Sequence, residues 1–242
     1  MQGLALWQIA LGAVCGFSVG VAKSGLPGAG IYVVPAMVLL VGDARFAAGW
    51  MLPMISVGDW FAIYHWRKHA HPRELATLAP WVVMGMVTGA AALSLTERSL
   101  RWGVGLIILL MLVLYLARRW RPETAVFPTH PSPYGVLTGF SSTVANAASP
   151  VMSLYLLSKR LPKERFLGTT AWFFFFLNLA KVPIYAWYGL FTRQSLTFDA
   201  LMILPIGAGA LAGRWIANHI DQRTFEIIII GISFLATLAL FI

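Results

Sequence analysis

Charged residues are scarce in this sequence, and long apolar stretches run without interruption. Only 11% of the 242 residues are charged, against about 25% in a typical soluble domain. Trp102–Ala117 and Ile227–Ile242 carry no charge at all, and a bilayer-spanning helix needs roughly 20 predominantly apolar residues. Because backbone polar groups must be satisfied internally within a bilayer, such stretches favour helices. The sequence therefore predicts an all-α polytopic membrane protein.

Cysteine is almost absent, which excludes two kinds of stabilising site. Cys15 is the only cysteine, so neither an intramolecular disulfide nor a cysteine-based metal cluster can form. His65, His69 and His71 lie close together in HWRKHAH, but no acidic residue separates them and the spacing matches no zinc-binding motif. We interpret this stretch as a basic cytoplasmic loop, and we predict no metal and no cofactor.

Acidic residues are also few, because nine of them stand against 18 lysines and arginines. The resulting net charge of +9 does not predict a nucleic-acid partner, since the basic residues lie at the ends of apolar segments. Lysine and arginine in those positions mark the cytoplasmic side of a membrane protein. The bilayer itself is therefore the expected partner.

A polar, proline-rich stretch, Arg118–Pro133, separates the apolar segments into two sets of four. These segments run approximately over residues 4–41, 46–66, 75–96, 102–117, 134–158, 166–191, 196–220 and 224–242. We predict an N-terminal transmembrane repeat over 1–119, an inter-repeat loop over 120–133 and a C-terminal transmembrane repeat over 134–242.

The two halves resemble one another. A shift of 123 residues aligns Gly16-Phe17-Ser18 with Gly139-Phe140-Ser141 and Pro27 with Pro150, and it gives eight identities in the 21 positions of Gly12–Tyr32. A shift of 124 aligns a second set of residues, namely Gly85 and Gly89 with Gly209 and Gly213. We infer an internal duplication, and we interpret these four glycines as points where helices cross closely.

Each half opens with an interrupted apolar segment. The first is broken by KSGLPGAG, Lys23–Gly30, and the second by NAASP, Asn146–Pro150. Glycine favours non-helical backbone, whereas proline suits the first turn of a new helix. We therefore expect two short half-helices in each half, with the second half-helix beginning near Pro27 or Pro150.

Each broken segment is either one tilted span or a re-entrant hairpin of two half-helices. With Lys23 and Lys181 set aside as intramembrane residues, single spans divide the other 16 lysines and arginines 9 to 7 between the two sides, and hairpins divide them 12 to 4. The positive-inside rule favours hairpins. Each half then crosses three times, so we expect the halves to be inverted relative to one another.

The two breaks are the best indication of a substrate site, because unwound backbone survives within a membrane only inside the protein or beside a wet cavity. Helix N-termini at the breaks favour an anion. Lys23 adds a positive charge, and Asn146 occupies the matching place. Alternatively, Lys23 extends to an interface or pairs with a carboxylate. The predicted substrate-binding set comprises Lys23, Ser24, Gly25, Gly28, Asn146, Ser149, Asn178 and Lys181.

Two further charges lie inside predicted spans. Asp59, in GDWFAIYHW, is interpreted as the only acid deep within a span, and Lys181 lies in FLNLAKVPIY. A charge at the bilayer centre costs about 2.5–3.5 kcal/mol on insertion scales, so it usually has a partner or a task. Asp59 either forms an ion pair with Lys23 or Lys181, or couples protons to transport. Asn178, one turn from Lys181, either binds substrate or packs helices.

These residues resemble the TauE/SafE sulfite exporter (TSUP) family of bacterial membrane permeases. The resemblance is carried by GFSVGVAKSGLPGAGIYVVP and GFSSTVANAASP at the two breaks, and by FFFFLNLAKVPIY. It implies transport of sulfite, organosulfonates or related small sulfur compounds. The second break departs from the family's glycine-rich pattern, with Ala147, Ala148, Val151, Met152 and Ser153, which indicates a pocket reshaped around Asn146.

We therefore predict a secondary transporter that exports a small anion across the bacterial inner membrane, with a passive anion channel as the alternative. A membrane potential that is negative inside favours anion efflux. The sequence has no P-loop, and no Ser–His arrangement or paired Asp lies at membrane depth, so we expect no enzyme. The expected partners are sulfite or an organosulfonate, protons and the lipid bilayer.

Overall fold

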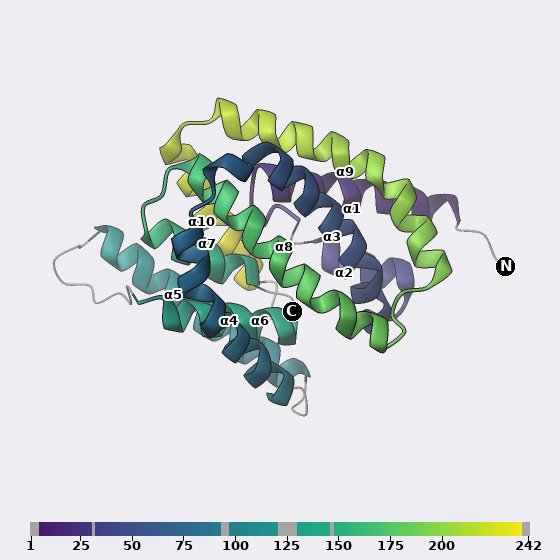
Figure 1. Ribbon diagram of the computed structural model, residues 1–242, viewed down its shortest axis with the longest axis horizontal. Helices are drawn as coiled ribbons and strands as arrows, with labels where there is room; N and C mark the ends of the chain where they lie inside the picture. Colours follow the sequence, from purple (N-terminus) through teal and green to yellow (C-terminus); the bar gives the residue numbers. More distant parts are fainter. Residues whose placement is uncertain (1–4, 31, 93–96, 121–129, 146–147, 239–242) are drawn as a thin grey trace. The chain divides into compact units, whose positions relative to one another are not determined.

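The computed structural model describes residues 5–30, 32–92, 97–120, 130–145 and 148–238. Within these ranges every regular element is a helix and no strand occurs (Figure 1), which confirms the all-α prediction. The elements are α1 (Leu6–Ser24), α2 (Val33–Val41), α3 (Ala44–Trp66), the 3₁₀ helix η1 (Arg67–His69), α4 (Pro72–Ala92), α5 (Glu97–Trp120), α6 (Pro131–Ala145), α7 (Ala148–Ser158), α8 (Lys163–Trp187), α9 (Arg193–His219) and α10 (Gln222–Leu238).

Five helical stretches in the described ranges are long and apolar enough to cross a membrane. They are Leu6–Ser24, Phe46–His69, Pro72–Ala92, Lys163–Trp187 and Arg193–His219. At a rise of about 1.5 Å per residue, lengths of 19 to 27 residues match a hydrocarbon core about 30 Å thick. The prediction of a multi-pass membrane protein is therefore confirmed.

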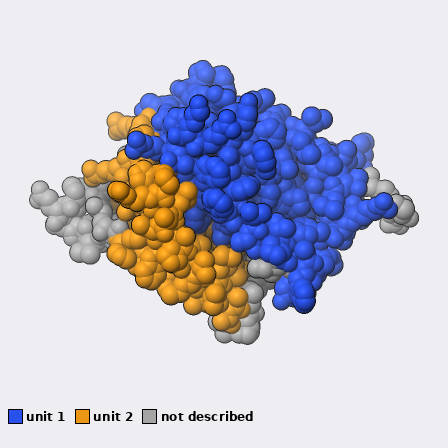
Figure 2. Space-filling model, in the orientation of Figure 1, with its two compact units in different colours: residues 1–70, 163–221 blue, residues 71–162, 222–242 orange. Residues whose placement is uncertain are grey.

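The chain forms two compact units that each combine segments distant in sequence (Figure 2). Unit 1 comprises Met1–Ala70 and Lys163–Asp221, and unit 2 comprises His71–Pro162 and Gln222–Ile242. Unit 1 thus contains α1, α2, α3, η1, α8 and α9, and unit 2 contains α4, α5, α6, α7 and α10. Each unit draws helices from both predicted halves of the sequence, and the duplication of those halves stays a prediction.

Within unit 1, α1 packs along α9 through backbone-to-backbone contacts. A Cβ added at Gly20 would overlap the carbonyl oxygen of Ile206, and one added at Gly209 would overlap the carbonyl oxygen of Phe17. Small residues that admit such close approach are typical of membrane helix pairs. The interpretation of Gly209 as a helix-crossing point is confirmed.

Within unit 2, α4 and α6 form a second crossing of the same kind. A Cβ at Gly85 would overlap the carbonyl oxygen of Val136, and one at Gly139 would overlap the carbonyl oxygen of Val82. Here, as in unit 1, glycines on both helices allow the backbones to touch.

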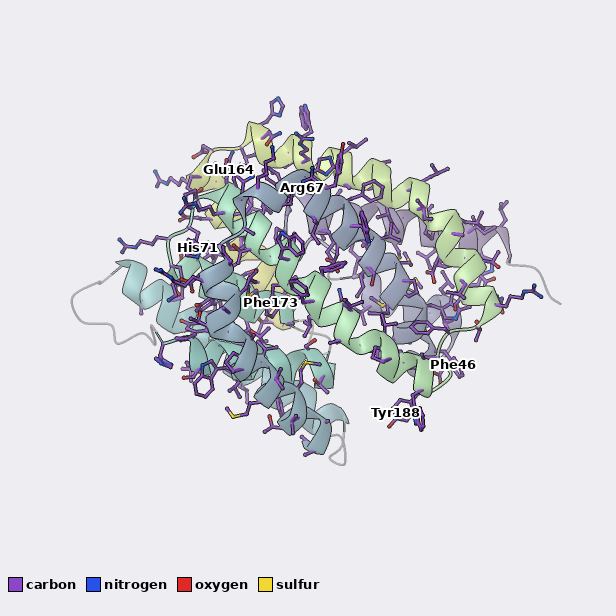
Figure 3. The ribbon with its side chains drawn as sticks, in the orientation of Figure 1. Phe46, Arg67, His71, Glu164, Phe173 and Tyr188 are labelled. Carbon is purple, nitrogen blue, oxygen red and sulfur yellow. The ribbon has the colours of Figure 1, made fainter. Side chains whose placement is uncertain are left out.

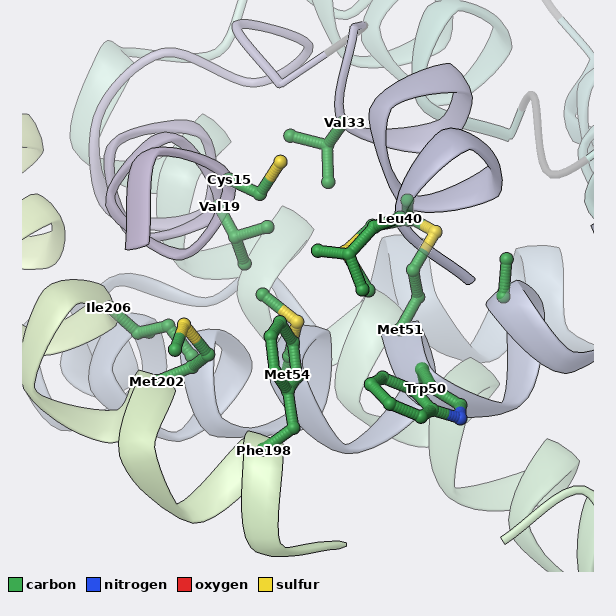
Figure 4. Close-up of a cluster of buried hydrophobic side chains, with 12 residues drawn as sticks. Cys15, Val19, Val33, Leu40, Trp50, Met51, Met54, Phe198, Met202 and Ile206 are labelled. Carbon is green, nitrogen blue, oxygen red and sulfur yellow. The ribbon is translucent and has the colours of Figure 1, made fainter. Parts of the chain in front are cut away.

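A cluster of apolar side chains from four helices fills the interior of unit 1 (Figure 4). It joins Cys15 of α1 and Met37 of α2 to Trp50 of α3 and Phe198 of α9, and all four are buried. The rings of Trp50 and Phe198 lie 5.1 Å apart between centroids. Because helices gain no hydrophobic stabilisation against each other in lipid, this dense van der Waals packing is what holds them together.

The first interrupted segment reverses the direction of the chain. Gln8, near the start of α1, donates from Nε2 to the carbonyl oxygen of Leu40, near the end of α2, at 3.2 Å. The hydroxyls of Ser18 and Tyr32 are also in contact across the two limbs. α2 therefore returns toward the end of the unit at which α1 begins.

The helix boundaries around this break differ from the expected ones. α1 is a full 19 residues long, and α2 begins at Val33 instead of near Pro27. Gly28 has a φ of 94°, a left-handed conformation that interrupts a helix, and Ala29 N–H donates to the carbonyl of Leu26 in a turn. The expectation of two short half-helices meeting at Pro27 was therefore wrong. In the second half, α7 begins at Ala148 and has Pro150 in its first turn, as expected.

Candidate functional site

A polar cluster lies inside unit 1, where α1, α3 and α8 meet. The ammonium Nζ of Lys23 lies 2.7 Å from Oδ1 of Asp59. On the other side, Nδ2 of Asn178 donates to Oδ2 of Asp59 at 2.7 Å. The side chain of Asp59 is 0% exposed, and each of its oxygens has a polar partner, as a buried carboxylate requires.

The backbone of α3 is shaped to admit Lys23. A Cβ added at Gly58, the residue before Asp59, would lie 3.0 Å from Cγ of Lys23 and 3.1 Å from Cγ1 of Val19. Glycine at this position lets α1 approach α3 with the lysine side chain between them. The ammonium of Lys23 also lies 4.6 Å from the ring centroid of Phe174 on α8, within the range of a cation–π contact.

Lys181 brings a second positive charge to the same place. It is buried in α8, 7% exposed, and it interacts electrostatically with both Lys23 and Asp59. The cluster therefore combines two ammonium groups with one carboxylate among the described residues. Charges this close interact strongly when little water separates them.

Ser24 ends α1 beside the cluster. Its carbonyl oxygen accepts a hydrogen bond of 2.8 Å from Nε1 of Trp66, which satisfies one of the carbonyls left unpaired at a helix end. Its hydroxyl is buried without a hydrogen-bond partner in the described part of the chain. Leaving such a group unpaired costs about 1–3 kcal/mol, so this hydroxyl suits a ligand that accepts a hydrogen bond.

Figure 3 shows how the helices around the cluster are oriented. Arg67, directly after α3, lies with Glu164, at the start of α8, at one end of unit 1. Phe46 and Tyr188 lie together at the other end. α3 and α8 therefore run antiparallel, and the polar cluster lies along their lengths, away from either end.

The structure brings together part of the predicted substrate-binding set. Lys23, Asn178 and Lys181 gather around Asp59 in unit 1, with Ser24 next to Lys23 along the chain. The ion pair joins α1 to α3, both in the first half of the sequence, and the hydrogen bond from Asn178 adds the second half.

The other predicted residues have different environments. Gly25 follows α1, and a Cβ there would overlap the carbonyl oxygen of Gly213. Gly28 lies in the turn after it, Ser149 lies in the first turn of α7 in unit 2, and Asn146 lies outside the described residues.

Of the three histidines, His65 contacts the carbonyl oxygen of Phe61 through Nδ1 at 2.8 Å, and His69 lies in η1. His71 precedes α4 in unit 2. The described ranges contain no group of three or more His, Cys, Asp or Glu side chains arranged to hold a metal ion.

One buried acid was missed by the sequence interpretation. Asp199 lies in the second turn of α9, is 5% exposed, and has no hydrogen-bond partner on either carboxylate oxygen in the described structure. Asp199 is therefore a second buried acid in unit 1, although it lies near the end of its span and not deep within it. Helical periodicity could have predicted its burial, because Asp199 lies on the same face of α9 as the buried residues Met202, Ile206 and Gly209.

A second polar cluster, in unit 2, was also missed. The hydroxyl of Tyr155 donates to Oε2 of Glu74, and Nζ of Lys159 lies 3.6 Å from the same oxygen. The ring of Tyr134 packs 5.1 Å from that of Tyr155. These contacts fasten the start of α4 to α7.

One comparison with known proteins identifies a family for this chain. Residues 11–240 match the sulfite exporter TauE/SafE family, and the match includes the whole of the unit 1 cluster. No curated protein and no solved structure gives a significant match. The family consists of transporters and not of enzymes, and it implies a small anionic sulfur compound as substrate. The chain belongs to the TauE/SafE sulfite exporter family.

Proposed function

We propose that this protein is a secondary transporter that exports sulfite, an organosulfonate or a related small anion across the bacterial inner membrane. The observation that carries the proposal is the unit 1 cluster, where Lys23 forms an ion pair with Asp59 and Lys181 interacts electrostatically with both of them. A bound monovalent anion would place a second negative charge beside these two ammonium groups. Opposite charges close together stabilise one another where little water separates them.

The proposed binding step is an exchange of partners at Lys23. The side chain of Lys23 is 16% exposed, whereas that of Asp59 is fully buried, so an arriving anion meets the lysine first. The anion accepts hydrogen bonds from the ammonium groups and from the unpartnered hydroxyl of Ser24. Charge-assisted hydrogen bonds are the strong ones, and they replace the hydration that a small anion loses in the site.

Asp59 has two proposed roles in this exchange. Without substrate it holds Lys23 through the ion pair, and Asn178 holds its second oxygen. When Lys23 turns to the anion, Asp59 loses part of its charge compensation, and a proton is one way to restore it. Proton coupling at Asp59 therefore remains part of the proposal.

The second break is proposed to contact the anion as well. Asn146 matches Lys23 in the alignment of the two halves, and Ser149 lies in the first turn of α7. A helix N-terminus presents unpaired N–H groups and the positive end of its dipole, which favour an anion.

The proposed inverted halves are supported by matching helix pairs. α1 and α6 are the first helices of the two halves, and α9 and α4 are the fourth. In each unit the first helix of one half packs on the fourth helix of the other through glycines that align between the halves. Inverted repeats of this kind let a transporter alternate between two openings around one site.

A liposome flux assay tests the function. Purified protein is reconstituted, and efflux of sulfite, small sulfonates and chloride is followed for the wild type, Lys23→Ala and the exposed control Lys68→Ala. Losing a charged hydrogen bond costs about 1.5–3 kcal/mol, so we expect sulfite flux to fall roughly tenfold or more in Lys23→Ala. Lys68→Ala should match the wild type.

Unaltered flux in a folded Lys23→Ala protein would remove the central residue from the site. Lys181→Ala gives a second variant of the cluster, and gel filtration checks that both variants are folded. Flux that shows no saturation and no exchange of external for internal sulfite would instead establish a passive channel.

A further inference from the structure

Asp199 belongs to neither polar cluster, and its two nearest core neighbours along α9 are apolar. It lies between Phe198 and Met202 on α9, and both of these residues belong to the buried cluster of unit 1 (Figure 4). Phe198 packs on the ring of Trp50 on one side, and on Gly12 of α1, where a Cβ would overlap it, on the other.

No side chain on the helices packed against α9 compensates the carboxylate. α9 packs against α1 and α3, and neither oxygen of Asp199 has a hydrogen-bond partner in the described structure. The titratable side chains described on these three helices are Cys15, Lys23, Asp59, Tyr64, His65, Arg193, Arg214 and His219. None of them forms a hydrogen bond or ion pair with Asp199.

The first turn of α9 does not supply a partner for the Asp199 carboxylate either. Ser195, one turn earlier on the same face, already accepts from the N–H of Thr192 and donates to its carbonyl oxygen. This capping box fixes the first turn of α9. Asp199 lies beyond that turn, where the helix dipole no longer stabilises an anion.

An ionised carboxylate cannot be held in such a place without a partner, and the group takes up a proton instead. We propose that Asp199 is a proton-binding site: its carboxyl is protonated in this conformation and releases the proton to water when the α1–α9 crossing opens around it. The proton leaves a carboxyl oxygen for a water molecule, and the resulting carboxylate is solvated.

The consequence for transport rests on the proposed function. If an anion is carried through unit 1, opening and closing of the α1–α9 crossing is accompanied by loss and gain of this proton. Asp199 then makes the flux depend on pH without touching the substrate. This role differs from that of Asp59, whose charge is compensated by Lys23.

Infrared spectroscopy of the protein in lipid tests the proposal directly. A protonated carboxylic acid has a carbonyl band separate from those of carboxylates. At neutral pH we expect this band in the wild type, its loss in Asp199→Asn, and its retention in Asp43→Asn. Asp43 is the matched control, because its exposed carboxylate caps α3 and asparagine caps equally well.

A wild-type spectrum without a protonated carboxyl at neutral pH would overturn the proposal, whatever the variants do. So would a band whose intensity is unchanged in Asp199→Asn. The coupling is tested separately, by sulfite flux at several pH values, where Asp199→Asn should lose part of the pH dependence that the wild type and Asp43→Asn share, and an unchanged pH profile in Asp199→Asn would contradict the coupling. Absent flux in the wild type would contradict the proposed function and leave the spectroscopic result to decide on Asp199.

Discussion

At the scale of single residues, unit 1 buries two acidic side chains in two different environments. Asp59 is surrounded by partners from two other helices, Lys23 and Asn178. Asp199 has none. Unit 1 therefore contains one buried acid with partners and one without, and the first is suited to holding an anion site and the second to binding a proton.

The Lys23–Asp59 pair leads to a prediction about stability. Removing one partner of a buried ion pair typically costs about 3–5 kcal/mol, because the other charge stays buried, whereas replacing both is often neutral. We expect Asp59→Asn to lower the thermal unfolding temperature of the detergent-solubilised protein. The double variant Lys23→Met/Asp59→Asn should recover most of the loss.

Recovery of stability in the double variant should not bring recovery of sulfite flux, since the charge of Lys23 is gone. A double variant as unstable as Asp59→Asn would contradict this prediction. The loss of stability would then not come from leaving Lys23 without its ion-pair partner.

At the scale of helices, glycine contacts position the polar cluster. α1 carries Lys23, and its placement depends on the close crossing with α9, where Gly209 touches the backbone of Phe17. Inside lipid, packing of this kind contributes much of the attraction between helices. The site is therefore sensitive to substitutions that touch no charged residue.

A matched pair of glycine variants tests this dependence. Gly209→Ala forces α1 and α9 apart, so we expect a lower unfolding temperature and loss of flux. Gly231 lies in α10 with nothing within 4 Å of an added Cβ, and alanine there should be neutral or stabilising by roughly 1 kcal/mol. Equal behaviour of the two variants in thermal unfolding would contradict the close crossing.

The helices themselves could be predicted, because long apolar segments favour helices in a membrane and charges mark the ends of most of them. Helix boundaries at the first break could not, because Gly28 extends the turn beyond Pro27 through its left-handed backbone. The sequence also singled out Lys23, Asn178 and Lys181, which the structure places around Asp59. It could not select Lys23 as the partner of Asp59, because pairing depends on how α1 and α3 approach at Gly58.

At the scale of the whole molecule, each compact unit is built from helices of both halves of the sequence. α8 and α9 of the second half complete unit 1, whereas α4 and α5 of the first half complete unit 2. The first helix of each half packs on a glycine-lined helix of the other half. Neither half alone contains that partner, and the proposed inversion of the halves accounts for this arrangement.

Membrane topology follows from the proposed hairpins and is open to measurement. With Cys15 replaced by serine, single cysteines are placed at Lys68, Lys159 and Arg193, and a membrane-impermeant thiol reagent is applied to oriented vesicles. We expect positions 68 and 159 to react from the same, cytoplasmic, side and position 193 from the opposite side. Reaction of positions 68 and 159 from opposite sides would instead indicate that the broken segments each cross once.

The central claim is that the ammonium groups of Lys23 and Lys181 bind the transported anion, and Lys181→Met tests it most directly. This change leaves the Lys23–Asp59 pair intact and neutral, and it removes a like charge beside Lys23, so the fold should be retained. Calorimetric titration of purified protein with sulfite should show binding at least about tenfold weaker than in the wild type, with Lys68→Met unchanged. Sulfite binding of wild-type strength in Lys181→Met would contradict the account.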